Sequence, residues 1–545
     1  MARWISCLAL CIGWSAVALA APSIGGLQNN YSYLLSGTPN YGIAQGSIFV
    51  LYGSQMAPAG LLQGGFNPVL DKNLGGVTLT VTVNGSTTQA IPYYVSPGQI
   101  SAILPSATPV GDGTITVAYG GQTSPPFPIK VVRSAFGLMT MSGNGLGQAV
   151  MMDAGFNLLT PTNAAAEDQV VIFWGSGLGG YVGDETMLIS NPQSLDSLPF
   201  ELYIGNKKAE TLYHGRSQYP GLDQIVARIP RGSTGCFVSV YVKTGDYISN
   251  FNTIPVAAEG KVCAEPFVDP SELQTFTQQE SVTAGWLYLG RFTNFARLPG
   301  GGTTHLLNDA ANAQFLRYSP FNYGNYGGIS QPSFGNCVVS MFVLTNPFVA
   351  PTLEYLDAGQ VSLTLPSGAV KPLVKNSSIS SYVLSGATTD ASLPLFVGQP
   401  GETFAFQGTG SDKVGPFTAS VTLPPAFSTT NLEGMTNISR SQDLELTWMG
   451  GDPSSYVVVT GTSSDLATVF TAFSCSARAS AGRLTVPRDV LASMVPSKVI
   501  ANSPLATTGQ LIVYNYMLPK NFTVDKIDNA NISFYTGETA VVDYQ

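Results

Sequence analysis

The chain has 545 residues, of which 10% are charged and 44% are hydrophobic. This length exceeds what one hydrophobic core supports, so we expect roughly three or four domains. The 59 glycines, 36 prolines and many tyrosines and phenylalanines favour short strands joined by tight turns over long charged helices. The formal net charge is −9 and basic residues are sparse, which excludes the basic footprint that binding to nucleic acid requires.

Residues 1–20 have the features of a secretory signal peptide. Arg3 supplies a positive start, residues 5–17 are apolar, and residues 18–20 (ALA) fit the small-x-small pattern of a cleavage site. No later segment holds about 18 consecutive apolar residues, so we expect no membrane span. The sequence therefore predicts an exported protein, located in the medium, at the cell surface or in the periplasm.

Two segments of the first half of the chain recur later in the sequence. Residues 46–54 (GSIFVLYGS) return as 168–176 (DQVVIFWGS), and residues 97–105 (PGQISAILP) return as 220–230 (PGLDQIVARIP). The period of roughly 120 residues is too long for a solenoid repeat and suits a duplicated domain. Short strands with turns between them predict a β-sandwich in each copy.

Five fragments of the duplicated region carry a resemblance to a known group of domains. They are LYGS at 51–54, LGGV at 74–77, YVSPGQI at 94–100, WGSGLG at 174–179 and YPGLDQI at 219–225. From about residue 38 to residue 263, the chain resembles the paired IPT/TIG-type immunoglobulin-like repeats of secreted acidobacterial proteins of uncharacterised function. The resemblance implies tandem immunoglobulin-like sandwiches and export, and it brings no catalytic residue.

The sequence of the C-terminal half predicts a second β-rich region. Residues 264–290 form a polar connector, a helical turn is expected at 489–494, and a cut near Thr430 divides the half into two sandwiches. The expected organisation is all-β throughout, with tandem immunoglobulin-like β-sandwiches. It comprises a signal peptide (1–20), two immunoglobulin-like sandwiches (21–133 and 134–263), a linker (264–290), a third sandwich (291–430) and a fourth (431–545).

Four cysteines remain after removal of the signal peptide, and an even number in an exported chain indicates disulfides. Cys236 is expected to pair with Cys263, because a strand, a turn and a second strand return the chain to the same edge. Cys337 is expected to pair with Cys475 by elimination, which would join the two C-terminal sandwiches. With no CxxC pair and two histidines, a Cys/His metal site is not expected.

Three patterns could indicate chemistry, and each has a structural alternative. Residues 175–180 (GSGLGG) fit a dinucleotide-binding pattern, but no helical pattern follows, so a turn between strands is the better interpretation. His214 and His305 are the available bases for a hydrolase triad, but neither accompanies a nucleophile motif. The acidic turns at Asp184-Glu185 and at Asp443/Glu445 lack a calcium-loop pattern and are interpreted as solvated, although calcium binding between domains stays open.

An aromatic, glycine-rich segment at 318–328 is the best candidate for ligand binding. Its rings, Tyr318, Phe321, Tyr323 and Tyr326, could stack on sugars or pack on a protein partner, or else pack on their own sandwich. We expect no catalytic residue, no cofactor and no metal. The leading interpretation is a secreted, non-catalytic structural or adhesive module that binds an extracellular protein, polysaccharide or surface. The alternative is a carbohydrate-binding or enzyme-accessory protein for extracellular polysaccharide, and an unrecognised hydrolase comes third.

Overall fold

The computed structural model describes residues 20–65, 69–196, 198–258, 261–266, 273, 279–297, 302–319, 332–343, 353–376, 380–390, 395–500 and 507–545. The described residues form an all-β fold of tandem β-sandwiches, as the sequence predicts. The expected helical turn is present as α4 (Arg488–Ala492). Among the described residues, none of the helices is long and apolar enough to cross a membrane. The predicted signal peptide lies almost entirely outside them.

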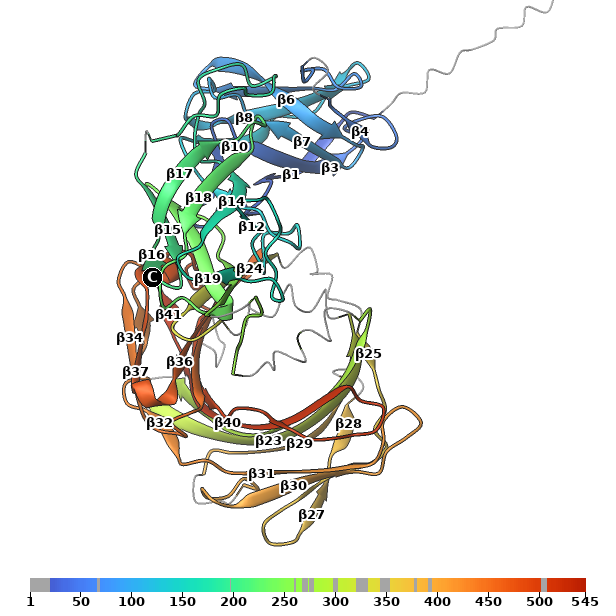
Figure 1. Cartoon of the computed structure of the whole chain (residues 1–545), viewed down its shortest axis with the longest axis vertical. Helices are drawn as coiled ribbons and strands as arrows, with labels where there is room; N and C mark the ends of the chain where they lie inside the picture. Colours follow the sequence, from blue (N-terminus) through green and yellow to red (C-terminus); the bar gives the residue numbers. More distant parts are fainter. Residues whose placement is uncertain are drawn as a thin grey trace, which may run out of the picture.

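Residues 23–132, here called the first unit, form one sandwich at the top of Figure 1. Strand β6 pairs with β5 through its first half and with β7 through its second half, so it connects the two sheets. The short strand β2 runs parallel to β10. The strands are β1 (Ser23–Asn29), β2 (Ile43–Ala44), β3 (Ile48–Ser54), β4 (Leu62–Gln63), β5 (Thr78–Val83), β6 (Ser86–Val95), β7 (Gln99–Ile103), β8 (Gly111–Tyr119), β9 (Gln122–Thr123) and β10 (Phe127–Val132).

Residues 137–257, the second unit, repeat this arrangement. Strand β13 runs parallel to β21 as β2 does to β10, and β14 pairs with β18 as β3 does with β7. The duplication seen in the sequence is therefore present in the strand pairing. The strands are β11 (Gly137–Leu138), β12 (Met151–Asp153), β13 (Ala165–Ala166), β14 (Val170–Ser176), β15 (Phe200–Ile204), β16 (Lys207–Lys208), β17 (Glu210–Arg216), β18 (Asp223–Arg228), β19 (Gly235–Thr244), β20 (Tyr247–Ile248) and β21 (Asn252–Ala257).

Residues 282–545, the C-terminal unit, are built on one strongly curved sheet, visible at the bottom of Figure 1. The sheet has 11 strands, nine of which follow the order β24-β36-β35-β38-β40-β22-β23-β29-β28. These strands are β22 (Val282–Arg297), β23 (Thr303–Tyr318), β24 (Cys337–Val343), β28 (Val374–Asn376), β29 (Ser381–Thr388), β35 (Tyr456–Ser464), β36 (Val469–Arg478), β38 (Gln510–Tyr516) and β40 (Asn529–Val541), with β25 (Glu354–Tyr355) and β39 (Lys520–Asn521) paired beside them.

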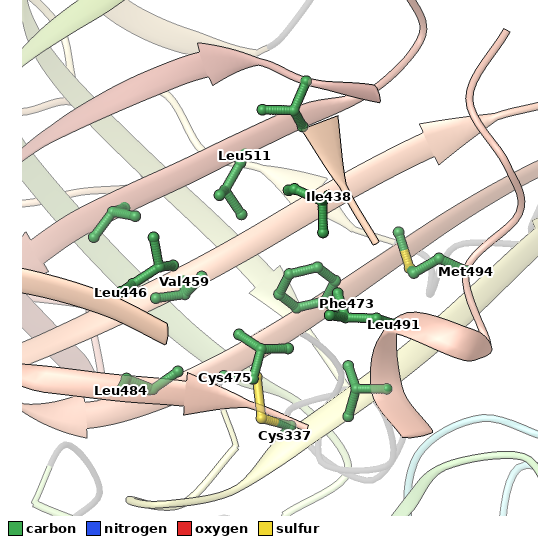
Figure 2. Close-up of a cluster of buried hydrophobic side chains, with 14 of the residues drawn as sticks. Cys337, Ile438, Leu446, Val459, Phe473, Cys475, Leu484, Leu491, Met494 and Leu511 are labelled. Carbon is green, nitrogen blue, oxygen red and sulfur yellow. A yellow bond between two sulfur atoms is a disulfide. The ribbon is translucent and has the colours of Figure 1, made fainter. Parts of the chain in front are cut away.

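Smaller sheets cover the two ends of this curved sheet, and each encloses a separate core. The first consists of β26 (Val361–Thr364), β27 (Val370–Pro372), β30 (Thr403–Gly408) and β31 (Phe417–Thr422). The second end is covered by β32 (Phe427–Thr429), β34 (Leu444–Gly450) and β37 (Arg483–Val486), with β33 (Asn437–Ile438) beside β41 (Asp543–Tyr544). Leu446, Phe473 and Leu491 lie in this second core, shown in Figure 2.

The C-terminal half does not divide near Thr430 into the two separate sandwiches that the sequence predicts. Strand β22 pairs in parallel with β40, from Ala284 opposite Asn529 to Phe295 opposite Ala540. Strands from the expected third and fourth sandwiches therefore lie in one sheet, and the two cores share it. The chain also enters the sheet at Val282, within the segment expected to be a linker at 264–290.

Candidate functional site

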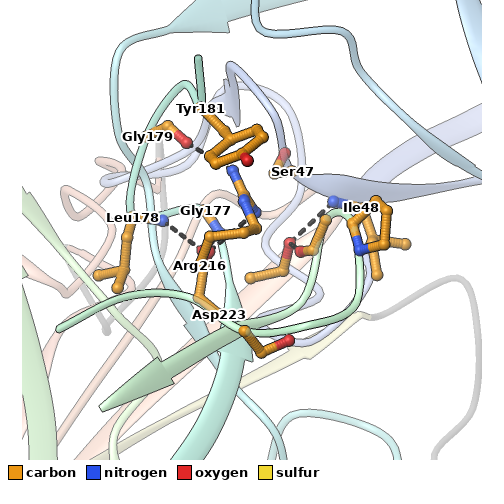
Figure 3. Close-up of polar contacts among 12 residues, drawn as sticks. Ser47, Ile48, Gly177, Leu178, Gly179, Tyr181, Arg216 and Asp223 are labelled. Carbon is orange, nitrogen blue, oxygen red and sulfur yellow. Dashed lines mark hydrogen bonds and ion pairs between the residues drawn. The ribbon is translucent and has the colours of Figure 1, made fainter. Parts of the chain in front are cut away.

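The glycine-rich loop at residues 175–180 surrounds a carboxylate of the chain itself (Figure 3). The backbone N–H groups of Gly177 and Leu178 donate to Oδ2 of Asp223 at 2.7 and 2.8 Å. Arg216 forms an ion pair with Asp223 at 2.8 Å and donates to the carbonyl oxygen of Gly179 at 2.7 Å. Burial raises the pKa of Asp223 to about 6, while Arg216 and the two amides act to lower it. The loop thus holds an internal anion, and strand β14 leads into it without a following helix.

Polar contacts fix the first unit against the second beside this loop. Ser176 accepts from the backbone N–H of Ile48 at 2.8 Å and donates to the carbonyl oxygen of Gly221 at 2.6 Å. The Ser106 hydroxyl and backbone N–H donate to the two oxygens of Glu185 at 2.6 and 2.8 Å. Glu185 is buried, so the prediction of a solvated acidic turn is wrong at this residue, because the first unit covers it.

The second unit joins the C-terminal unit through both polar and apolar contacts. Ser239 donates its N–H and its hydroxyl to Oδ1 of Asn336, at 2.8 and 3.0 Å. Lys243 forms an ion pair with Asp489 at 3.0 Å. Tyr241 and Phe251 of the second unit are buried within the second core of the C-terminal unit. The two units consequently share one continuous hydrophobic cluster.

Asn40 connects the first unit to both others. Its side-chain amide donates to the Ser493 hydroxyl of the C-terminal unit at 3.2 Å. Its side-chain oxygen, Oδ1, accepts from the backbone N–H of Ile248, in the second unit, at 3.2 Å. The loop between β1 and β2, which carries Asn40, therefore meets all three units at one place.

A cavity of about 730 Å³ lies at this junction. All three units contribute to its lining, which includes Tyr33, Tyr52, Gln99, Asn144, Met341 and Val343. The described lining residues include no Asp, Glu, Lys, Arg or His. The volume falls within the range of about 300–1,000 Å³ that ligand sites occupy, and domain junctions are where such sites are commonly found. This cavity is the candidate functional site.

Tyrosines of the first unit form one wall of the cavity. Tyr52 lies on β3, directly opposite Gly26 of β1 on one side and Gln99 of β7 on the other. Burial raises the pKa values of Tyr33 and Tyr52, and the proximity of Tyr94 adds to both effects. These rings therefore stay neutral at physiological pH. The wall can supply aromatic faces and hydroxyl groups.

The structure contains both predicted disulfides. Cys236 is bonded to Cys263 across a sequence separation of 27, and Cys337 to Cys475 across a separation of 138. Cys337 and Cys475 are directly opposite on neighbouring strands of the curved sheet, as Figure 2 shows. This bridge lies within one sheet, so it does not connect two separate sandwiches.

Of the four rings of the aromatic segment proposed from the sequence, only that of Tyr318 lies among the described residues. Tyr318 is buried, with 7% of its surface exposed, and its ring centroid lies 6.3 Å from that of Trp286. Phe321, Tyr323 and Tyr326 lie outside the described residues. Tyr318 belongs to a small buried cluster with Ala284 and Leu316 and does not present its ring to a ligand.

The two histidines do not form a hydrolase triad with the residues described around them. His214 lies 3.2 Å from Asp196, and its pKa is lowered by burial while Asp196 acts to raise it. The nearby Ser194 hydroxyl bonds to Asp196 at 2.5 Å and to the backbone carbonyl oxygen of His214 at 3.2 Å, so it is directed at the acid and the backbone and not at the imidazole ring. His305 lies 2.7 Å from Glu433. Among the described residues, no group of three His, Cys, Asp or Glu side chains could hold a metal ion.

Comparison with protein families and with curated proteins finds no match. Among solved structures, SGBP-B from a complex xyloglucan utilization locus in Bacteroides uniformis is similar at 12% identity and a TM-score of 0.18, covering 74% of this chain and 97% of that one. SGBP-B from a Bacteroides ovatus mixed-linkage glucan utilization locus, in complex with a heptasaccharide, has 10% identity and a TM-score of 0.14 (75% and 87%). Sidekick-1 immunoglobulin domains 1–5 have 12% identity and a TM-score of 0.11 (94% and 98%). These TM-scores are low, so the candidate site is assigned from the residues of this chain alone.

Proposed function

We propose that the chain is a secreted, non-catalytic module, structural or adhesive, that binds an extracellular partner at the junction cavity. The observation that carries the proposal is that three β units converge on one cavity and are held together by buried contacts between the units. Such an arrangement presents a preorganised site on a rigid scaffold, which lowers the entropic cost of binding.

The non-catalytic part of the proposal rests on the chemistry of the lining. Acid–base and nucleophilic catalysis usually employ His, Asp, Glu, Lys or Cys, and the described lining carries none of these; its titratable groups are tyrosines whose pKa values burial raises. The extracellular location is supported by the two disulfides and by the predicted signal peptide. We further propose that the first two units are paired IPT/TIG-type repeats of the acidobacterial kind; their matching strand pairing supports the paired-repeat part of this assignment.

Carbohydrate binding, or an accessory role to enzymes of extracellular polysaccharide, is the second candidate function. The observation that favours it is the combination of tyrosine rings with an uncharged lining. Aromatic rings on a rigid β scaffold bury much area at little entropic cost, and they suit the apolar faces of sugars as well as protein surfaces.

The proposal is tested by filling the cavity. Gly26 lines it, and a Cβ at this position would meet only Tyr52, at the ordinary contact distance of 3.7 Å. Gly26→Phe should therefore fold and abolish retention of the mature chain on washed cell envelopes of the source organism. Gly65→Phe is the matched control, because Gly65 lies on the first unit with open space around it and outside the cavity lining. Equal retention of both variants would refute the junction as the binding site.

A further inference from the structure

The geometry of the junction cavity points to a neutral oligosaccharide as its ligand, and we propose this ligand class for the site. The inference rests on the proposed function, because it names what the same cavity binds. Three features carry it: the absence of charge in the described lining, the open face of one tyrosine ring, and a backbone conformation that is held at the cavity wall.

The first feature is the neutrality of the lining. The chain has a net charge of −9, yet the described residues around the cavity include no ionisable group other than tyrosine. A charged ligand would lose its hydration there without gaining a counter-charge, which is costly in a partly enclosed site. A neutral ligand with many hydroxyl groups avoids this cost, because it can exchange hydrogen bonds with amides, hydroxyls and backbone groups.

The second feature is the row formed by Gly26, Tyr52 and Gln99 across three strands. Gly26 has no side chain, so the flank of the Tyr52 ring that a Cβ would contact at 3.7 Å stays uncovered. On the opposite flank, the amide of Gln99 is fixed by donating to the Tyr94 hydroxyl at 2.6 Å. Gln99 lines the cavity next to Tyr52, so the side-chain oxygen of this held amide is an acceptor that a ligand could use. An aromatic surface with an adjacent amide oxygen suits a pyranose, which has an apolar face and a rim of hydroxyl groups.

The third feature is the conformation of Tyr33, which stands on the cavity wall with φ of +56°. A bulky residue in this region is strained, and such strain persists only where the surrounding structure holds it. Gln28, also in the lining, does so by donating its side-chain amide to the carbonyl oxygen of Tyr33 at 3.1 Å. Residues held in this way are concentrated at active sites and at sites that clamp a ligand.

Calorimetric titration of the mature full chain tests the inference. The probes are neutral hexasaccharides of α-1,4-glucose, β-1,4-glucose, β-1,4-xylose and β-1,4-mannose, with hexagalacturonate as the anionic counterpart. At least one neutral probe should bind, and hexagalacturonate should bind about tenfold or more weakly, which corresponds to about 1.4 kcal/mol. Gly26→Phe and Tyr52→Ala should each weaken the neutral ligand by about tenfold or more, whereas Gly65→Phe should not.

Gln99→Leu leaves the ring in place and serves as a second variant in case Gly26→Phe proves unstable. It should also weaken binding of the neutral ligand. Failure of every neutral probe, or undiminished binding by Gly26→Phe and Gln99→Leu, would overturn the inference. If Gly26→Phe loses envelope retention but no neutral probe binds, the oligosaccharide is refuted as the ligand while the cavity remains the binding site. A peptide would then be the next ligand class to test. Retention unaffected by Gly26→Phe would refute the proposed function as well.

Discussion

Nη1 of Arg216 lies 2.8 Å from Oδ1 of Asp223, and both side chains are fully buried. The same carboxylate accepts hydrogen bonds from two backbone amides of the glycine-rich loop. The segment that follows this loop contacts the first unit through Glu185. This ion pair therefore supports the contact between the first two units. Breaking a buried pair by removing one partner leaves an uncompensated charge, which typically costs about 3–5 kcal/mol.

Replacing Arg216 by methionine should lower the free energy of unfolding by about 3–5 kcal/mol at pH 7. Arg231→Met is the matched control, because Arg231 also pairs with an aspartate, Asp168, but is 81% exposed. Pairs this exposed contribute about 0–1 kcal/mol, so the control should hardly change stability. Urea unfolding at pH 7 measures both, and equal losses would contradict the structural role assigned to Arg216.

The loss in Arg216→Met should shrink as the pH falls. Burial already raises the pKa of Asp223 to about 6, and Arg216 acts to lower it, so removing Arg216 raises that pKa further. A carboxyl group with a raised folded-state pKa binds its proton more tightly in the folded state, so its stability contribution is lost as the pH rises through that pKa. The difference between wild type and variant should thus be smaller at pH 5 than at pH 7. A constant difference across this range would argue against a buried charged carboxylate.

Gly177 should tolerate no side chain, because the loop must approach the preceding segment closely. Its φ is +111°, and a Cβ would lie 2.4 Å from the carbonyl oxygen of Ala135. Gly121→Ala is the control, since Gly121 has a φ of +77° but open space around it. The control should lose about 1–2 kcal/mol from the left-handed backbone alone, and Gly177→Ala should lose clearly more. Thermal unfolding of both variants checks this, and a smaller loss at Gly177 would contradict it.

The strands that the sequence revealed are those with local signals. Strand β5 alternates buried and half-buried residues, and its hairpin turn is Asn84-Gly85, so pattern and turn agree. Strand β22 has no such alternation, because Leu287 packs into a core while Trp286, on the opposite face, contacts Tyr318. Its pairing with β40 joins residues far apart in sequence, which no local pattern reports. The division expected near Thr430 failed for this reason.

The junction cavity could not be predicted from the sequence either. Its lining comes from three units, and no motif unites Tyr52, Asn144 and Met341. The left-handed conformation of Tyr33 accompanies a local hydrogen bond from Gln28, and that of Asn40 accompanies contacts with both other units. By contrast, the disulfides were predictable, because cysteine count and strand layout limit the pairing.

Removing the two disulfides should cost unequal amounts. In the chain-entropy model, a closed loop of 27 residues stabilises by about 3–4 kcal/mol and one of 138 residues by about 5 kcal/mol. The double variant Cys337→Ala/Cys475→Ala should consequently lower the melting temperature more than Cys236→Ala/Cys263→Ala. Scanning calorimetry under non-reducing conditions compares them. The reverse order would mean that loop length does not decide the effect.

Tyr318 should behave as a core residue. Because Tyr318 is buried beside Ala284 and Leu316, its replacement by alanine should cost about 3–5 kcal/mol of unfolding free energy. Tyr355→Ala, at a tyrosine that is 44% exposed and lies on a neighbouring strand, should cost much less.

If Tyr323 and Tyr326 stack on sugar, Tyr323→Ala/Tyr326→Ala should reduce polysaccharide retention while the melting temperature stays nearly unchanged. A lower melting temperature with full retention would show that these rings support packing, which would leave the junction cavity as the proposed site for sugar.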